Sequence, residues 1–293
     1  MTVARPNLKE WTFKEVQEDW FTKIESEEDR LKVVKPEVKF IKGGDHDHDQ
    51  TIMVSFPRSG NTMLRAYLEK ILGVSTGSDG DIKAKLIGEL MQRGLAGEGL
   101  VDKRVFVVKS HYPERWGRQR FYCERAILLV RNPIDSITSL FNMVCTGTHH
   151  RSILDSDFKK FALIWMDFLQ QDITVWKDFH NFWLKSKIPV HIIRYEDICE
   201  KPFPTLKSLV SFLTNKEDIT GTKLEQYVRL ACDESSPEIY KPREGKVNGN
   251  LKKFNRVQLD TLYSETANLL KLFNYDHIYL SNGAEETLSK DDQ

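Results

Sequence analysis

The segment SFPRSGNT, residues 55–62, combines residue types that bind anions. It follows the apolar run at 51–54 and precedes MLRAYLEKIL, whose apolar spacing predicts a helix. Backbone N–H groups at a helix start point at a bound anion, and the helix dipole favours its negative charge. Arg58 adds a guanidinium that suits a phosphate-like group. We predict an anion cradle; the alternative is a plain strand-to-helix turn capped by Ser59.

The loop departs from GxxxxGK[ST], the phosphate-binding motif of nucleotide triphosphatases. Gly60 and Thr62 match it, but Ser55 stands for the first glycine and the lysine is absent. Triphosphate hydrolysis also needs a magnesium carboxylate, commonly an Asp at the end of a nearby strand. The predicted strand RAILLVR ends instead in Arg131, a cation that repels a metal ion. The sequence therefore favours an anion held without magnesium over a nucleotide kinase or triphosphatase.

A second anion site is predicted within LLVRNPIDSITSLFN, residues 128–142. Pro133 suits the first position of a helix, and Asp135 strengthens a helix start. Arg131 ends the strand and Ser139 lies just over one turn into that helix, so the two side chains can grip one phosphate. The same pattern is also ordinary helix-start chemistry. Two anion sites at the carboxyl ends of adjacent strands suit a ligand with two separated phosphate-type groups.

The segment VVKSHYPERW, residues 107–116, supplies a candidate base. His111 follows a predicted strand end by two residues, on the sheet edge where ligands bind. A neutral imidazole there takes a proton from an attacking hydroxyl or amine. Lys109, on the strand itself, holds negative charge that develops near the transferring group. The alternative is a structural histidine; the other histidines have no comparable setting.

Alternating strands and helices predict an α/β fold with a central parallel sheet flanked by helices. Short runs rich in β-branched residues indicate buried strands at 51–56, 105–109, 125–131 and 190–195. The helices predicted between and after them cover 62–72, 82–94, 134–145, about 157–185, 204–214, 222–232 and 256–273.

The predicted organisation is an N-terminal helical extension (1–48), a main domain (49–280) and a polar tail (281–293). Apolar residues recur at helical spacing in the extension: Trp11, Phe13, Val16, Trp20 and Ile24. GGDHDHDQ, residues 43–50, reads as a solvated polar loop rather than a metal site, because no distant ligand set completes one.

Charge and composition narrow the classes of protein. Lys plus Arg and Asp plus Glu both number 43, which gives no global electrostatic case for nucleic acid or a membrane surface as partner. The four cysteines lack CxxC spacing, so they read as single thiols in a reducing compartment. The N-terminus shows no apolar signal segment, and no stretch approaches 18 apolar residues. We expect a cytoplasmic protein.

Three motifs together resemble the P-loop sulfotransferases that use 3′-phosphoadenosine 5′-phosphosulfate (PAPS), most closely their soluble, cytosolic type. SFPRSGNT resembles the 5′-phosphosulfate loop, usually YPKSGTTW; RNPIDSITS resembles the 3′-phosphate motif; KSHYP resembles KTHLP, which holds the catalytic base. Residues 176–213 follow the family's order of helix, strand, YED and a leucine-rich helix, so the resemblance spans about 50–214. It implies the three-layer architecture of P-loop nucleoside triphosphate hydrolases.

The resemblance implies catalytic roles for three residues. Arg58 takes the place of the family's loop lysine and contacts the sulfuryl and bridging oxygens. His111 is the base and Lys109 its charged neighbour. The residues implied to donate hydrogen bonds to the 5′ phosphate are the rest of the loop: Ser59, Gly60, Asn61 and Thr62.

The resemblance also implies how the rest of the donor is held. Arg131 and Ser139 bind the 3′ phosphate, and Tyr195 packs near the adenine. Met63 departs from the pattern, since many relatives have an adenine-stacking tryptophan there, so the purine pocket must be completed differently.

The family's C-terminal loop RKGxxGDWKxxF, which closes over the donor, is partly matched by REGKVNGNLKKF, residues 243–254. Arg243, Gly245 and Phe254 fit, and the first two are implied to bind the donor. Glu244 replaces a lysine and the Asp-Trp pair is missing, which implies weaker donor binding or an altered lid.

The implied reaction is in-line transfer of SO₃ from PAPS to a hydroxyl or amine, with no metal required. The alternative is a catalytically silent relative that binds or scaffolds. The acceptor is expected to be a small molecule lying against 73–103, 144–157 and 234–250. Alcohols, phenols, amines, sugars and peptides all stay open, as does the oligomeric state.

Overall fold

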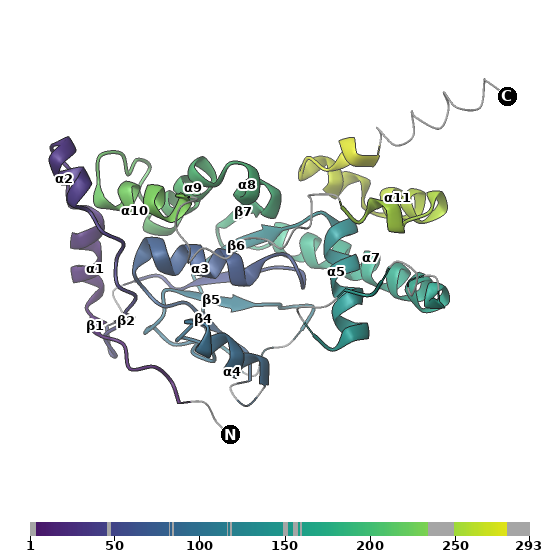
Figure 1. Cartoon of the computed structure of the whole chain (residues 1–293), viewed down its shortest axis with the longest axis horizontal. Coiled ribbons are helices and arrows are strands. Elements are labelled where there is room, and N and C mark those ends of the chain that lie inside the picture. Colours follow the sequence, from purple (N-terminus) through teal and green to yellow (C-terminus); the bar gives the residue numbers. More distant parts are fainter. Residues whose placement is uncertain are drawn as a thin grey trace. The chain divides into compact units, whose positions relative to one another are not determined.

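A five-stranded sheet with strand order β4-β5-β3-β6-β7 lies at the centre of the fold (Figure 1). The computed structural model describes residues 4–45, 48–81, 83, 85–115, 117, 119–148, 152–154, 158, 160–233 and 249–279. The chain divides into two compact units. The first unit comprises Met1–Ser55, Gly60–Leu129 and Ser186–Arg243, and the second comprises Phe56–Ser59, Val130–Lys185 and Glu244–Gln293.

The sheet contains all four predicted strands and one further strand. The strands are β3 (Thr51–Val54), β4 (Gly77–Ser78), β5 (Val107–Ser110), β6 (Arg125–Val130) and β7 (Val190–Arg194). β3 pairs in parallel with β5 on one side and with β6 on the other, and β4 pairs in parallel with β5. β4 was not predicted because two residues carry no periodicity. The α/β class with a central parallel sheet is confirmed.

The strand order creates a switch point at the carboxyl end of β3. After β3 the chain builds β4 and β5 on one side of it, and then crosses to add β6 on the other side. Ligands of open α/β sheets bind where the strand order reverses in this way. The two predicted anion motifs follow β3 and β6, which the structure confirms as adjacent strands.

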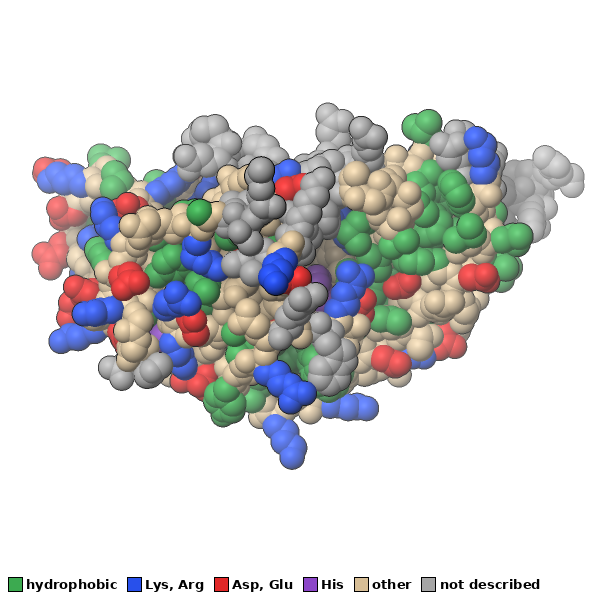
Figure 2. Space-filling model, turned by 90° about the horizontal axis from the view of Figure 1, so that it is seen from below, with side chains coloured by type: hydrophobic (Ala, Val, Ile, Leu, Met, Phe, Trp, Pro, Cys, Tyr) green, Lys and Arg blue, Asp and Glu red, His purple; other side chains and the backbone are tan. Residues whose placement is uncertain are grey.

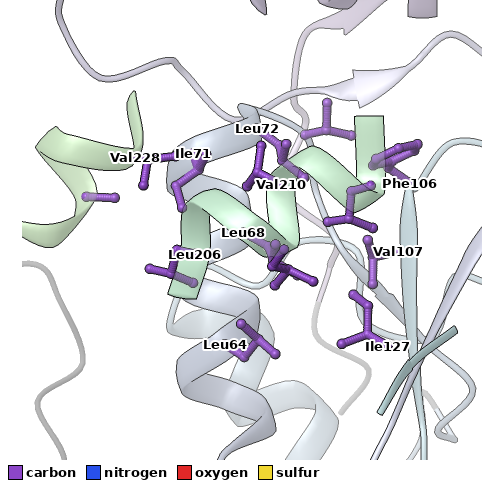
Figure 3. Close-up of a cluster of buried hydrophobic side chains, with 14 of the residues drawn as sticks. Leu64, Leu68, Ile71, Leu72, Phe106, Val107, Ile127, Leu206, Val210 and Val228 are labelled. Atoms are coloured by element: carbon purple, nitrogen blue, oxygen red, sulfur yellow. The ribbon is translucent and has the colours of Figure 1, made fainter. Parts of the chain in front are cut away.

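The core of the first unit lies between the sheet and helices α3 (Asn61–Leu72), α9 (Pro202–Thr214) and α10 (Lys223–Cys232) (Figure 3). Leu64 and Leu68 of α3 share this core with strand residues such as Ile127, and Ile71 lies beside Val228 of α10. Burying each such side chain contributes roughly 1.5–3 kcal/mol. Helix α4 (Lys85–Gln92) lies on the opposite side of the sheet (Figure 1). All of β3 is buried, as a parallel sheet covered on both faces requires.

The N-terminal segment packs into this same core. Helix α1 (Phe13–Trp20) buries Phe13, Val16 and Trp20, and Trp20 Nε1 donates to Leu72 O at 2.8 Å. Helix α2 (Glu27–Lys32) and the paired strands β1 (Glu10–Trp11) and β2 (Phe40–Ile41) complete it. The expectation of a solvated loop at 43–50 is wrong for His48, which is buried with its ring 4.7 Å from that of Phe13.

Within its described residues, the second unit contains three long helices. They are α5 (Pro133–Thr146), α7 (Ala162–Leu184) and α11 (Arg256–Leu272), with a short 3-10 helix at Leu251–Lys253. Helix α7 packs on both α5 and α11, and the rings of Phe141, Phe158 and Trp165 form tilted and edge contacts with centroids 5.0–5.3 Å apart. The first turns of α7 expose Leu163, Ile164 and Met166.

Hydrophobic side chains gather over one part of the surface in the view of Figure 2. Within the described ranges, we find no helix that is both long and apolar enough to cross a membrane.

The predicted helices at 134–145 and 222–232 match α5 and α10 to within a residue, whereas the predicted helix at 157–185 begins later, at Ala162. The predicted boundaries at 48 and 280 stay predictions.

Candidate active site

The first-unit part of the SFPRSGNT loop turns sharply into α3. Gly60 caps the helix in the left-handed region with φ 104°, and no side chain caps the first turn. A Cβ at position 60 would lie 2.5 Å from Cδ2 of Tyr195, the first residue of α8 (Tyr195–Glu200). The backbone at Gly60 therefore touches the tyrosine ring, and only glycine fits there. Ser55 Oγ donates to Asn61 Oδ1 at 3.0 Å and closes the loop.

In the second unit, the predicted anion-binding side chains are joined by hydrogen bonds. Arg58 Nε donates to Ser139 Oγ at 3.0 Å, and an Arg131 guanidinium nitrogen donates to Arg58 O at 2.9 Å. We call these three residues the arginine cluster. Arg58 sits at φ 68°, a strained backbone conformation for a residue with a side chain, and such strain concentrates at functional sites.

Helix α5, which carries Ser139, begins as predicted. Asn132 caps it by accepting from Ile134 N at 3.0 Å, and Pro133 occupies the first turn. Asp135 does more than favour the helix start, because it is buried and accepts from Asn250 Nδ2 at 2.8 Å. Asn250 belongs to the segment 243–254 that partly matches the family's C-terminal loop, and this bond joins the described end of that segment to α5.

The second unit contains two buried hydroxyls that could donate hydrogen bonds to a phosphate-bearing donor. Ser59 and Ser136 are each fully buried, and neither hydroxyl oxygen has a hydrogen-bond partner within the described part of the chain. A buried hydroxyl left without a partner costs free energy, which a bound acceptor oxygen removes. Ser59 adjoins Arg58, so its donor lies beside a cation. These residues fit the phosphate-type groups of PAPS.

His111 lies just beyond β5 in the first unit, and its tautomer follows from one contact. Its Nδ1 lies 2.8 Å from Ser55 O, an oxygen that only accepts, so Nδ1 carries the proton and donates. Nε2 is then the basic nitrogen. Burial and the nearby Lys109 charge lower the pKa of His111 well below its usual range, so the ring is neutral at pH 7.

Lys109, on β5, lies in a desolvated environment. Burial lowers the pKa of its ammonium to about 8, against the opposing pull of Asp79 and Glu98. The Nζ atom makes no hydrogen bond or ion pair with another described residue. We call Lys109 and His111 the reactive pair. A cation in such a site interacts strongly with charge that appears beside it.

Asp79, which no sequence pattern marked, supports the turn that carries His111. Asp79 follows β4, and its Oδ2 accepts from Ser110 Oγ at 2.6 Å. Ser110 Oγ in turn accepts from Tyr112 N at 3.0 Å. No periodic pattern marks Asp79, since β4 has two residues. The register that places Ser78 beside Lys109 is visible only in the folded sheet.

The remaining predicted residues fall as follows. Thr62 lies in the first turn of α3, and Met63, in the place of the expected tryptophan, is buried under Gly60. Phe254 is buried with its ring 5.4 Å from that of Trp165. Arg243 and Gly245 lie outside the described residues.

Comparison with known proteins addresses the family. Residues 48–236 match the family model described as the sulfotransferase domain. This range contains the SFPRSGNT loop, the reactive pair and the start of α5. A WSCD family member of Aedes aegypti is 33% identical over 165 residues, which is 56% of this chain and 50% of the relative. One of Drosophila melanogaster is 29% identical over 165 residues, with the same shares.

The chain thus spans about half the length of the curated relatives it matches. Among solved structures, mouse sulfotransferase SULT7A1 complexed with PAP is 17% identical, with a TM-score of 0.49 over 81% of this chain and 89% of that one. Retinol dehydratase in complex with androsterone and inactive cofactor PAP is 15% identical, with a TM-score of 0.44 over 76% and 80%.

Proposed function

Because this chain belongs to the sulfotransferase domain family, we propose that it transfers a sulfuryl group from PAPS to a hydroxyl or amine of a small-molecule acceptor. PAPS supplies the activated sulfuryl group. The state of His111 carries this proposal: Nδ1–H donates to Ser55 O, which leaves Nε2 as a base in a ring that is neutral at pH 7. A protein that only binds nucleotide has no use for such a base.

The arginine cluster, Ser59 and the start of α3 bind and orient the donor in this proposal. Arg131 and Ser139 hold the 3′ phosphate, and the backbone N–H groups that follow Gly60 hold the 5′ phosphate. Arg58 reaches the bridging oxygen. Tyr195, which lies on Gly60, borders the adenine. These roles come from the family resemblance, and the hydrogen bonds within the cluster support them.

The reactive pair performs the transfer. His111 Nε2 takes the proton of the acceptor hydroxyl or amine as its oxygen or nitrogen attacks sulfur from the side opposite the bridging oxygen. The bond from sulfur to that oxygen breaks, and its electron pair leaves with 3′-phosphoadenosine 5′-phosphate (PAP). Lys109 and Arg58 stabilise negative charge on the sulfuryl and bridging oxygens. This electrostatic stabilisation needs no metal ion.

The test is transfer of label from PAPS carrying ³⁵S to a panel of alcohols, phenols, amines, sugars and peptides, with a chelator present. We expect label on at least one acceptor class and loss of transfer in His111→Ala. PAP binding without transfer to any class, unchanged by this substitution, would identify a silent binding protein. Transfer that needs magnesium would point to phosphoryl chemistry instead. A cytoplasmic location stays a prediction from the sequence.

A further inference from the structure

A buried carboxylate lies directly beside the strand that carries the reactive pair. Asp79 is 7% exposed and follows β4, whose Ser78 is in register with Lys109. Asp79 N donates to Lys109 O at 3.2 Å, so the two backbones are joined at this point. Burying a carboxylate is costly unless a hydrogen bond or an opposite charge compensates it. The protein therefore keeps Asp79 here against a substantial desolvation cost.

Asp79 is fixed in place by its neighbours. Its Oδ2 accepts from Ser110 Oγ, and Ser110 Oγ accepts from Tyr112 N, so this chain of hydrogen bonds brackets His111 on both sides. Gly117 packs on the carboxyl group, since a Cβ at position 117 would lie 2.2 Å from Asp79 Oδ2. The carboxylate cannot swing away from β5 without breaking these contacts.

Four charged side chains act on Lys109, and three of them have a partner of opposite charge. Glu98 and Arg65 form a buried ion pair with each other, so their effects on Lys109 oppose one another. Arg115 lies 3.0 Å from its own partner, Glu114. Asp79 forms no ion pair within 4 Å with a described residue, and the cation that lowers its pKa is Lys109.

We propose that Asp79 is a positioning residue of the transferase site, which keeps Lys109 charged and holds the turn that carries His111. The catalytic consequence rests on the proposed function; the electrostatic link between the two side chains does not. Burial lowers the pKa of Lys109 and raises that of Asp79, and each charge stabilises the other. Without the carboxylate, the pKa of Lys109 falls from about 8 toward neutral pH, and a larger fraction of the ammonium loses its proton there.

The direct test is NMR titration of the full chain with ¹³Cε-labelled lysine, in which Lys109→Arg assigns the signal. We expect Asp79→Asn to lower the pKa of Lys109 by about one pH unit or more, since a close opposite charge shifts a pKa by that amount. Asn retains an oxygen that accepts from Ser110. Asp81→Asn, two residues further along, removes an equal charge and is expected to leave the titration unchanged. An unchanged pKa in Asp79→Asn overturns the proposal.

Transfer kinetics give a second, independent reading. Asp79→Asn is expected to lower kcat at least about tenfold at pH 8 and less at pH 6.5, since Lys109 regains its proton at lower pH. In a Lys109→Met background the same substitution is expected to cause no further loss. An equal loss in both backgrounds contradicts the proposal. If Asp79→Asn does not fold, Asp79→Ser serves both measurements. Because the titration needs no acceptor, absence of transferase activity would refute the proposed function and leave this test standing.

Discussion

The arginine cluster and the reactive pair handle charge in opposite ways. In the cluster, Arg131 donates to the backbone carbonyl of Arg58 at 2.9 Å and Arg58 donates to Ser139 Oγ at 3.0 Å, so both guanidinium groups are held in a fixed arrangement. In the reactive pair, burial changes the groups themselves, lowering the pKa of both Lys109 and His111. Fixed cations suit the binding of an anion, whereas a neutral imidazole suits proton uptake and a buried cation suits the charge that develops during the transfer. The difference separates binding from chemistry, and substitutions should separate them too.

The largest difference between the effect on turnover and the effect on PAP binding is expected for substitution of His111. We expect His111→Ala to lower turnover by about 10²- to 10⁴-fold, the usual contribution of a general base. PAP affinity should stay within about twofold, because the histidine acts on the acceptor rather than on the donor phosphates. Label transfer and calorimetric titration measure the two effects. His191→Ala, which removes a histidine stacked on Phe212, is the matched control. Equal losses of rate and affinity would show that His111 contributes to donor binding and would contradict its assignment as the base.

The pH profile of kcat/KM sharpens the contrast. Lys109 must be protonated and His111 neutral in the free enzyme. With the Lys109 pKa at about 8, kcat/KM is expected to fall about tenfold per pH unit above that value. The lowered pKa of His111 keeps the ring neutral, so activity should persist below pH 6.5. Lys109→Arg should remove the basic limb, because arginine does not titrate there. If kcat/KM still fell at high pH in that variant, a group other than Lys109 would cause the fall.

Two glycines with nearly the same φ give a matched pair that tests the contact at Gly60. Gly60 has φ 104° and Gly94 has φ 102°, but a Cβ at 60 meets Tyr195 whereas one at 94 meets nothing within 4 Å. Gly94→Ala is expected to cost about 1–2 kcal/mol from its backbone alone. Gly60→Ala should cost about 1–3 kcal/mol more, since the new methyl displaces the ring. Urea unfolding measures both; equal costs would remove the tyrosine contact from this account.

The smallest effect is expected inside the cluster. Ser139→Ala removes the acceptor of the Arg58 Nε–H bond and should weaken PAP binding by about 1 kcal/mol, or about fivefold in Kd. Thr174→Ala on α7 removes a similar hydroxyl far along the sequence and is the control. Tighter binding by Ser139→Ala would show that the serine competes with the donor for Arg58.

The sequence predicted those parts of the site that occur in continuous motifs. Arg58, Arg131 and His111 each lie at or just after the end of a strand that its β-branched residues reveal, and the strands expected to be neighbours, β3 and β6, are adjacent in the sheet. The bonds that join Arg58 to Ser139 and Arg131 were beyond prediction, because they depend on the left-handed backbone at Arg58.

The supporting residues were missed for a different reason. Asp79 follows a strand of two residues, and Asn250 meets Asp135 across more than a hundred residues of chain. Neither position has periodicity, a motif or a neighbouring partner in sequence. His48 was wrongly expected in solvent because its run of alternating Asp and His is polar, whereas the aromatic rings that bury it come from α1 and the residue before β5. Long-range contacts of this kind are set by tertiary packing.

The most direct test of the account is calorimetric titration with PAP, without magnesium, of the wild type, Arg131→Ala and His111→Ala. We expect binding by the wild type and near-normal binding by His111→Ala. Arg131→Ala should lose at least about tenfold in affinity, because it gives up charge-assisted bonds to a phosphate. Absence of binding by the folded wild type, or equal affinity in Arg131→Ala, would contradict the assignment of the arginine cluster as the donor site.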